Sequence, residues 1–398
     1  MAEMNISKRG TMLPPSPIRK LIPYAEAAKK KGTHVYHLNI GQPDIETPPE
    51  FWHAVKNYAQ KVLAYGNSQG MADYLKKLSG YYKRYNLDIN PEDIIVTTGG
   101  SEAIIFAMTA ICDPGDEIIV FEPFYTNYNG FAIQAGIKLV PLTTKPEDGY
   151  HLPTASEIEE KINNKTRGIL YCNPNNPTGT IYTKDEIMRL KDIAIKHDLY
   201  LLADEVYREY IYEGEYISLM SLTDIHDRAI MLDSISKRFS ACGARVGNLV
   251  TKNKAIYTAS LHLGQARLCS PTLEQVGAAA AYDLGDDYFE KMIGEYRNRR
   301  DVVYDGLMKI DGTVCIKPSG AFYIMAKLPI DSAEAFAQFM LTDFSYKGKT
   351  VMVAPGPGFY ASPGQGGSEC RLAYVLNTKD LADAMVILKR GVEAYNAR

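Results

Sequence analysis

The sequence of 398 residues predicts an α/β fold with a large domain, built on a mainly parallel sheet covered by helices, and a smaller α+β domain. From about residue 90, short continuous apolar segments alternate with helical patterns, which is typical of parallel strands buried on both faces. After about residue 290 the pattern changes to longer helices with separate strand-like segments. A chain of this length also predicts two or three domains.

The large domain is expected to contain a series of short buried strands with helices between them. The strand segments are 93–98, 117–121, 168–171, 199–203 and 229–233. A helix is expected over 101–111, after two glycines. Another helix is expected to run through Ile195, because Thr183 and Glu186 form a capping box ahead of an apolar periodic segment.

The smaller domain is expected to combine the two ends of the chain. Hairpin-like strands are predicted around 320–327 and 369–375, and helices over 333–344 and 379–397. The first 50 residues are rich in proline and read as an extended arm with one short helix near 22–31. We therefore predict a large domain over 49–289, and a small domain formed by 1–48 together with 290–398.

The composition excludes several classes of protein. There are 44 basic and 47 acidic residues, so the chain has no basic footprint for nucleic acid. No apolar segment approaches the roughly 18 residues needed to span a bilayer, and the N-terminus lacks the apolar core of a secretory signal. Six cysteines occur without a CxxC pair, so we expect free thiols in a reducing compartment, no metal site and a cytoplasmic location.

Ligands of open α/β sheets bind beyond the carboxyl ends of the strands, so the residues that follow each strand matter most. The first predicted strand is followed by Gly99, Gly100, Ser101 and Glu102, which open a helix whose free N–H groups could hold a phosphate. An ordinary glycine turn fits the same residues. The pattern is neither a P-loop nor a GxGxxG dinucleotide motif.

Further polar residues follow the later strands. The turn 173–179 (NPNNPTG) is stiffened by two prolines and could be only a rigid loop. Asp204 could be a helix cap, or it could hold a protonated ring nitrogen. Lys237 lies just past a strand, where desolvation would make its amine nucleophilic. Arg371 offers a fork that matches a carboxylate, although a surface ion pair would also explain it.

The order of these features is more specific than any one of them. A phosphate-type turn, an asparagine turn, an aspartate, a lysine with Arg245 eight residues later, and a late arginine fit a site for pyridoxal 5′-phosphate (PLP) with an amino acid. The sequence resembles the class I/II aminotransferases, which are PLP enzymes of fold type I. The resemblance extends from Ser16 to Arg371, and its most specific parts are NPNNPTG (173–179), ADEVY (203–207) and SISKRFSACGARVG (234–247).

This resemblance implies a role for each matching residue. Lys237 would carry PLP as a Schiff base and act as the general base and acid, while Asp204 would pair with the pyridine nitrogen. Asn176 and Tyr207 would hydrogen-bond the ring oxygen O3′. The other implied cofactor contacts are the stacked ring of Tyr125, the phosphate contacts Gly100, Ser101, Glu102, Ser234, Ser236 and Arg245, and Tyr65 reaching the neighbouring subunit. The implied substrate contacts are Arg371 on the α-carboxylate with Gly41 and Asn176 nearby.

The resemblance also implies a homodimer with its active site at the interface. We expect aspartate or glutamate as amino donor and a 2-oxo acid such as 2-oxoglutarate as acceptor. Some aspartate-specific relatives carry a lysine where this chain has Ser101, which weakens that expectation. Arg267 could bind a second substrate carboxylate across the dimer, or form a structural ion pair, and both interpretations stay open.

Other functions fit the same motifs. A PLP-dependent C–S β-lyase, a decarboxylase, a cyclopropane-forming synthase, or a broad or aromatic aminotransferase would reuse Lys237 and Asp204. A non-catalytic sensor of PLP or amino acids in a transcription regulator is a further alternative. It is disfavoured because only about 35 residues precede the YHLNIGQPD segment, too few for a helix-turn-helix domain.

Overall fold

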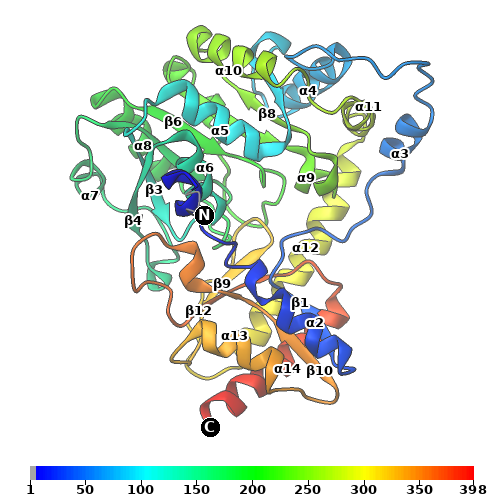
Figure 1. Cartoon of the computed structure of the whole chain (residues 1–398), viewed down its shortest axis with the longest axis vertical. Helices are drawn as coiled ribbons and strands as arrows, with labels where there is room; N and C mark the ends of the chain where they lie inside the picture. The colour runs from blue at the N-terminus through cyan, green and yellow to red at the C-terminus, as the bar shows by residue number, and fades with distance from the viewer. Residues whose placement is uncertain (1–5) are drawn as a thin grey trace, which may run out of the picture.

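A computed structural model describes residues 6–398 and contains three sheets. The strands are β1 (His34–His37), β2 (Ile94–Thr97), β3 (Glu117–Glu122), β4 (Lys138–Thr143), β5 (Thr166–Cys172), β6 (Tyr200–Asp204), β7 (Ala229–Ser234), β8 (Gly247–Val250), β9 (Tyr323–Lys327), β10 (Lys349–Met352), β11 (Ala354–Pro355) and β12 (Glu369–Ala373). The strands of the largest sheet all lie between residues 94 and 250, in the upper part of Figure 1.

The largest sheet has seven strands in the order β2-β8-β7-β6-β5-β3-β4. All neighbours are parallel except that β8 runs antiparallel to β2 and β7. This arrangement confirms the predicted mainly parallel sheet, and the five predicted strands correspond to β2, β3, β5, β6 and β7. Sequence analysis missed β4 and β8. The edge strand β4 is half-exposed and contains Pro141, which an edge tolerates, while β8 has only four residues.

Helices cover the sheets and fill the connections, as Figure 1 shows. The α-helices are α1 (Lys8–Met12), α2 (Ile22–Lys30), α3 (Pro49–Lys56), α4 (Ala72–Arg84), α5 (Gly99–Ile111), α6 (Asn127–Ala135), α7 (Ala155–Glu159), α8 (Lys184–Lys196), α9 (Ile235–Arg238), α10 (Lys254–Ala266), α11 (Thr272–Ala281), α12 (Asp286–Leu307), α13 (Ala333–Thr342) and α14 (Thr378–Asn396). The predicted capping box before α8 is confirmed, because the Thr183 hydroxyl accepts from Glu186 N and the Glu186 carboxylate accepts from Thr183 N.

The two smaller sheets join distant parts of the chain in the lower part of Figure 1. Strand β1 pairs in parallel with β10, so the N-terminal arm packs beside the C-terminal region as expected. Strand β12 lies between β11 and β9 and is antiparallel to both. The strands predicted around 320–327 and 369–375 are confirmed as β9 and β12, which pair antiparallel. They do not form a simple hairpin, because α13, β10 and β11 separate them along the chain.

The long helix α12 runs between the upper and lower parts of the molecule (Figure 1). The predicted boundary between residues 289 and 290 falls inside this helix, and the division into two domains stays a prediction. Residues 1–5 of the expected small domain lie outside the described residues. Within residues 6–398, no helix combines the length and the apolar character needed to cross a bilayer.

A buried ion network lies beneath α9. Arg238 donates to both carboxylate oxygens of Asp233, at 2.8 and 2.9 Å, and to Glu209 Oε1 at 2.7 Å. The side chains of these three residues are fully buried, and Arg238 also donates to the Tyr282 hydroxyl. A buried charge is tolerated only when it is paired and hydrogen-bonded, so this network holds α9 against the end of β7.

The substitution Arg238→Met should lower the free energy of unfolding by about 3 to 5 kcal/mol, because it leaves two buried carboxylates without their cation. Urea denaturation followed by circular dichroism measures this change. Lys29→Met is the control, since Lys29 pairs with Glu26 at the surface, where both side chains are exposed, and should change stability by less than about 1 kcal/mol. Equal effects of the two substitutions would contradict the role given to the buried network.

Candidate active site

A cavity of about 450 Å³ lies at the carboxyl ends of β2, β5, β6 and β7. Residues that follow these strands line it from the side of the large sheet. Further lining residues come from the N-terminal arm, from the loop after β1, and from strands β9 and β12 of the smaller sheets. The lining residues from the smaller sheets and the N-terminal arm are Ser16, Ile18, Arg19, Ile40, Gly41, Gln42, Tyr323 and Arg371. The location agrees with the expectation that ligands bind beyond the carboxyl ends of the strands.

Lys237 enters the cavity from α9. Its Nζ donates to the carbonyl oxygen of Gly41 at 2.6 Å and lies 3.6 Å from Cys242 Sγ. Neighbouring residues of a helix point in different directions, so the burial of Arg238 in the ion network directs Lys237 toward the cavity. The Tyr210 hydroxyl also donates to the carbonyl of Lys237. The amine is thus held by its own helix and contacts a backbone oxygen from the opposite side of the cavity.

Asp204 is a buried carboxylate at the end of β6. It accepts from the Tyr128 hydroxyl at 2.7 Å and from Val206 N at 3.4 Å. Both partners are neutral, and burial raises the pKa of Asp204 to about 6. A cation beside this carboxylate would offset the cost of burial, so Asp204 is suited to hold a protonated ring nitrogen.

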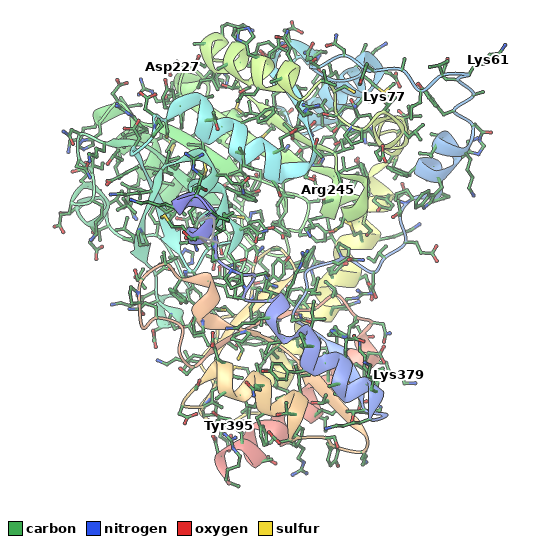
Figure 2. All side chains as sticks on the ribbon, viewed as in Figure 1. Lys61, Lys77, Asp227, Arg245, Lys379 and Tyr395 are labelled. Atoms are coloured by element: carbon green, nitrogen blue, oxygen red, sulfur yellow. The ribbon has the colours of Figure 1, made fainter. Side chains whose placement is uncertain are left out.

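Neighbouring groups lie very close to the backbone of the turn at the start of α5. Gly99 has a φ of +76°, and a side chain there would collide with the guanidinium of Arg245. A side chain at Gly247 would collide with the backbone of Gly99 and Gly100. Figure 2 shows Arg245 beside this end of α5 and α9. The first N–H groups of a helix and a guanidinium together form a cradle suited to a phosphate.

Two serines extend this cradle from the end of β7. Ser234 Oγ donates to the carbonyl of Val246 at 2.9 Å and lies 2.8 Å from Ser236 Oγ, and both residues line the cavity. Ser234 is also the N-cap of α9, since its hydroxyl accepts from Ser236 N. The hydroxyls therefore share the cavity wall with Gly100 and Ser101 of the turn.

Arg371 supplies a buried guanidinium without a carboxylate partner in the described chain. It donates to Asn176 Oδ1 at 3.0 Å and to the carbonyl of Asn39 at 2.6 Å, and its Nε has no hydrogen-bond partner. The rings of Tyr323 and Phe359 lie beside the guanidinium, and burial lowers its pKa. A buried cation with only neutral partners is suited to bind an anion.

Asn176 connects the two halves of the cavity. Its Nδ2 donates to the Tyr207 hydroxyl at 3.5 Å, while its Oδ1 accepts from Arg371. The Tyr207 hydroxyl is also 2.8 Å from the Tyr323 hydroxyl. One chain of hydrogen bonds therefore links the strand ends of the large sheet to the guanidinium.

Most predicted site residues meet at this cavity. Gly41, Gly100, Ser101, Tyr125, Asn176, Asp204, Tyr207, Ser234, Ser236, Lys237, Arg245 and Arg371 all line it. Glu102 lies next to the turn, and its carboxylate accepts from Thr98 N. Tyr65 is 80% exposed and lies away from the cavity, so its contact with a neighbouring subunit stays a prediction.

Arg267 also lies outside the cavity of its own chain. Its guanidinium donates to Ser270 Oγ at 2.8 Å and to the carbonyl of Val96 at 3.0 Å, and its Nε is 3.4 Å from a carboxylate oxygen of Glu102. These contacts agree with the structural ion pair that was one of the two interpretations. A role for Arg267 in binding substrate stays a prediction.

Sequence analysis did not identify several residues of the site. Tyr128 hydrogen-bonds Asp204, and its position three residues after Tyr125 could have indicated a second inward-facing ring. Tyr323 begins β9, whose pairing with β12 brings it beside Arg371. The antiparallel pairing of two distant strands left no local signal for Tyr323. Cys242 lies within the quoted motif 234–247, but no role was assigned to it.

Comparison with known proteins identifies the family. The family model described as "Aminotransferase class I and II" matches residues 33–387. The chain belongs to the class I and II aminotransferases.

This aminotransferase has relatives with different named substrates. Aspartate aminotransferase of Thermotoga maritima is 30% identical over 382 residues, which is 96% of this chain and 97% of the relative. Aromatic-amino-acid aminotransferase 2 of Thermococcus litoralis is 30% identical over 397 residues, with 96% and 97% of the chains covered. A solved structure of aspartate aminotransferase from Thermotoga maritima has a TM-score of 0.89 at 29% identity, and the match covers 98% of this chain and all of that one (100%).

Membership of this family confirms the predicted class of enzyme, the fold type I architecture and the cofactor. The aminotransferase uses PLP, and its substrates are an amino acid and a 2-oxo acid. The cavity fits this cofactor by the chemistry of its side chains: an amine, a buried carboxylate with only neutral partners, and a cradle that a side chain at Gly99 would fill.

The substitution Asp204→Asn should stabilise the cofactor-free protein at high pH. The pKa of the Asp204 carboxyl is about 6 in the folded protein and about 3.8 in the unfolded chain. The unfolded chain therefore loses its proton at a lower pH, and the free energy of unfolding falls as the pH rises from about 4 through 6. The loss corresponds to about 3 kcal/mol at pH 8, and the amide does not titrate.

Urea unfolding of both cofactor-free proteins between pH 4.5 and pH 8 measures this difference. The advantage of the asparagine variant should grow as the pH rises from 4.5 through about 6 and stay constant above that. Asp198→Asn is the control, because the Asp198 side chain is almost fully exposed. An advantage for Asp204→Asn that does not change with pH would contradict the proposed burial effect.

Proposed function

We propose that this aminotransferase moves an amino group between an acidic L-amino acid, aspartate or glutamate, and a 2-oxo acid such as 2-oxoglutarate, with Lys237 as the residue that carries the cofactor. One observation carries the proposal. The amine of Lys237, the carboxylate of Asp204 and the guanidinium of Arg371 converge on a single cavity from separate elements. We further propose that the two domains, 49–289 and 1–48 with 290–398, form its opposite walls.

The residues around the cavity would hold the cofactor at four points. The N–H groups of Gly100, Ser101 and Glu102, with Ser234, Ser236 and Arg245, would bind its phosphate. Asp204 would keep the ring nitrogen protonated, and the ionised carboxylate would gain the cation that its buried position lacks. Asn176 and Tyr207 would donate to the ring oxygen, and Tyr125 would stack on the ring.

Bound PLP supplies an aldehyde carbon that accepts amines and a ring that withdraws electrons. Lys237 would be released when the substrate amine takes its place. Its free Nζ would then remove the proton from the substrate Cα and deliver it to the cofactor carbon on the other side of the amine nitrogen. A positioned general base contributes about 10²- to 10⁴-fold in rate. The short helix α9 and the ion pairs of Arg238 would keep the amine within reach of the reacting atoms.

Arg371 would bind the α-carboxylate of the substrate. The guanidinium of Arg371 already donates hydrogen bonds to Asn176 and Asn39. Its Nε has no partner and could donate to a carboxylate oxygen. Since Asn176 also reaches Tyr207, substrate and cofactor would share one hydrogen-bond network. This coupling would orient the Cα–H bond toward Lys237.

The acidic substrate is supported by relatives named aspartate aminotransferase. A relative of equal identity is named for aromatic amino acids, so an aromatic or broad preference is the second candidate. The cavity favours acidic substrates, because Lys237, Arg245, Arg371 and Arg19 line it and Asp204 is the one carboxylate among its lining residues in the described chain. A C–S β-lyase would instead release ammonia and pyruvate from its substrate.

We also propose that the protein is a homodimer in the cytoplasm. Trp52, Val62, Leu63 and Tyr65 are exposed apolar or aromatic residues on α3 and the loop after it. This segment runs along the outside of the molecule in Figure 1, and Figure 2 labels Lys61 at its outer edge. Clustered exposed apolar side chains are typical of an interface, and six free cysteines fit a reducing compartment.

The decisive test of the proposed function concerns Lys237. Borohydride reduction followed by peptide mapping should find the reduced cofactor attached to Lys237, and Lys237→Ala should lose transamination of aspartate with 2-oxoglutarate by at least about 10³-fold while remaining folded. Lys196→Ala is the control, because the Lys196 side chain is exposed and pairs with Glu159 at the surface. Label on another lysine would contradict the assignment, and ammonia release without a requirement for a 2-oxo acid would favour the lyase.

Introducing charged residues into the proposed dimer interface tests whether the protein is a dimer. The double variant Val62→Glu with Leu63→Glu should shift sedimentation from dimer to monomer and lower activity, because burying two carboxylates in an apolar interface is unfavourable. Val386→Glu is the matched control, since Val386 is an exposed valine on α14. A wild-type enzyme that sediments as a monomer at micromolar concentration would refute the proposal.

A further inference from the structure

One basic residue of the cavity has no role in the mechanism described above. Lys237, Arg245 and Arg371 are accounted for by the amine chemistry, the phosphate and the α-carboxylate. Arg19 also lines the cavity. Among the lining residues of the described chain, Arg19 is the one cationic side chain to which these roles assign no anion. An additional anionic group on the substrate would balance it.

The backbone around Arg19 is held firmly. Arg19 begins the short 3-10 helix Arg19–Leu21, its N–H donates to Ser16 Oγ at 3.3 Å, and Leu21 is buried in the core. Pro17 packs closely against Gly358, where a side chain would collide with the proline ring. The neighbouring Lys20 pairs with Glu334 at 2.5 Å. The segment that carries Arg19 is therefore positioned by contacts that do not involve its guanidinium.

Arg19 is an exposed residue that lines the cavity, and its guanidinium forms no ion pair with a carboxylate of residues 6–398. Arg267, the other arginine considered for a second carboxylate, is already engaged by Glu102, Ser270 and the carbonyl of Val96. Of these two arginines, Arg19 is the one that lines the cavity and is free to bind a ligand.

The loop 39–42 indicates where the substrate side chain would go. Its Asn39 carbonyl contacts Arg371 at 2.6 Å and its Gly41 carbonyl contacts Lys237 at 2.6 Å, so the α-carboxylate and the reacting carbon would both lie along this loop. In the described chain, Arg19 is the only positively charged residue among the lining residues that have no role assigned above, which are Ser16, Ile18, Arg19, Ile40, Gln42, Ile104, Thr126, Asn127, Cys172, Val206 and Cys242. A side-chain carboxylate would therefore approach the N-terminal arm.

We propose that Arg19 determines specificity by binding the side-chain carboxylate of a dicarboxylic substrate. The inference rests on the proposed function, because it assigns the substrate class of the same site. A guanidinium binds a carboxylate with two parallel hydrogen bonds, which an aromatic or aliphatic side chain cannot accept. Arg19 thus discriminates among amino acids while Arg371 binds the α-carboxylate that they all share.

The test compares substrates in Arg19→Gln and Arg19→Lys. In Arg19→Gln, kcat/KM for aspartate and glutamate should fall about 10- to 100-fold more than kcat/KM for alanine, which is the effect of losing a charged hydrogen bond. The lysine variant should recover part of the loss, since it retains the charge. The loss should appear mainly in KM, and the absorbance spectrum of the bound cofactor should be unchanged.

Binding is measured separately from turnover. The dissociation constant of maleate, a dicarboxylate that cannot react, should rise in Arg19→Gln by about the same factor, as followed by the cofactor absorbance. Lys20→Gln is the matched control, because Lys20 is the adjacent basic residue, is absent from the cavity lining and pairs with Glu334. It should leave both maleate binding and the substrate preference within about twofold of wild type.

The possible failures are distinguishable. A wild-type enzyme that does not prefer aspartate and glutamate to alanine would overturn the proposed substrate class, and the Arg19 assignment with it. If wild type does prefer them, but Arg19→Gln lowers all substrates equally, the role of Arg19 alone is refuted. A selective loss in Arg267→Ala with no selective loss in Arg19→Gln would also refute it, and would assign the second carboxylate to Arg267.

Discussion

The ion pairs of the buried guanidinium of Arg238 hold α9, and the geometry of the cavity depends on them. Asp233 and Glu209 both pair with Arg238 inside the protein, at distances of 2.7 to 2.9 Å. Because the helix is anchored by this residue, the preceding Lys237 is directed into the cavity. A flexible lysine on an unanchored four-residue helix would sample many positions, and its amine would meet the substrate carbon less often.

The buried charges of this protein that are discussed above fall into two groups. Some pair with an opposite charge of the protein and stabilise the fold, while others have only neutral partners and lie at the candidate active site. In the ion network of Arg238 every charge has a partner from the protein. Asp204 and Arg371 are equally buried, yet their partners are neutral, and burial shifts both pKa values toward the uncharged forms. Protein stability is lowered by such groups unless a ligand supplies the opposite charge. The two uncompensated charges therefore indicate where a cationic ring and an anionic substrate bind.

The N-terminal arm contributes more than its composition indicates. Its prolines predicted an extended segment, and the structure uses that segment to connect α1 with the smaller sheets past the cavity. Pro17 and Leu21 fix the backbone on both sides of Arg19. The arm thus brings the charged side chain of Arg19 to a cavity whose other lining residues include many from strand ends far along the chain. The proposed control of substrate preference therefore belongs to a different segment from the residues that would hold the cofactor.

The sequence by itself determined the parallel sheet, most of its strands, and the residues that follow them, because these features depend on local apolar runs and on motifs such as 173–179 and 234–247. It also indicated Lys237, Asp204 and Arg371. Only the tertiary structure decided which residues complete the site. Tyr323 reaches Arg371 through the pairing of β9 with β12, Arg267 meets Glu102, and Arg19 reaches the cavity from the other end of the chain. These contacts join segments far apart in sequence, and local periodicity carries no information about such contacts.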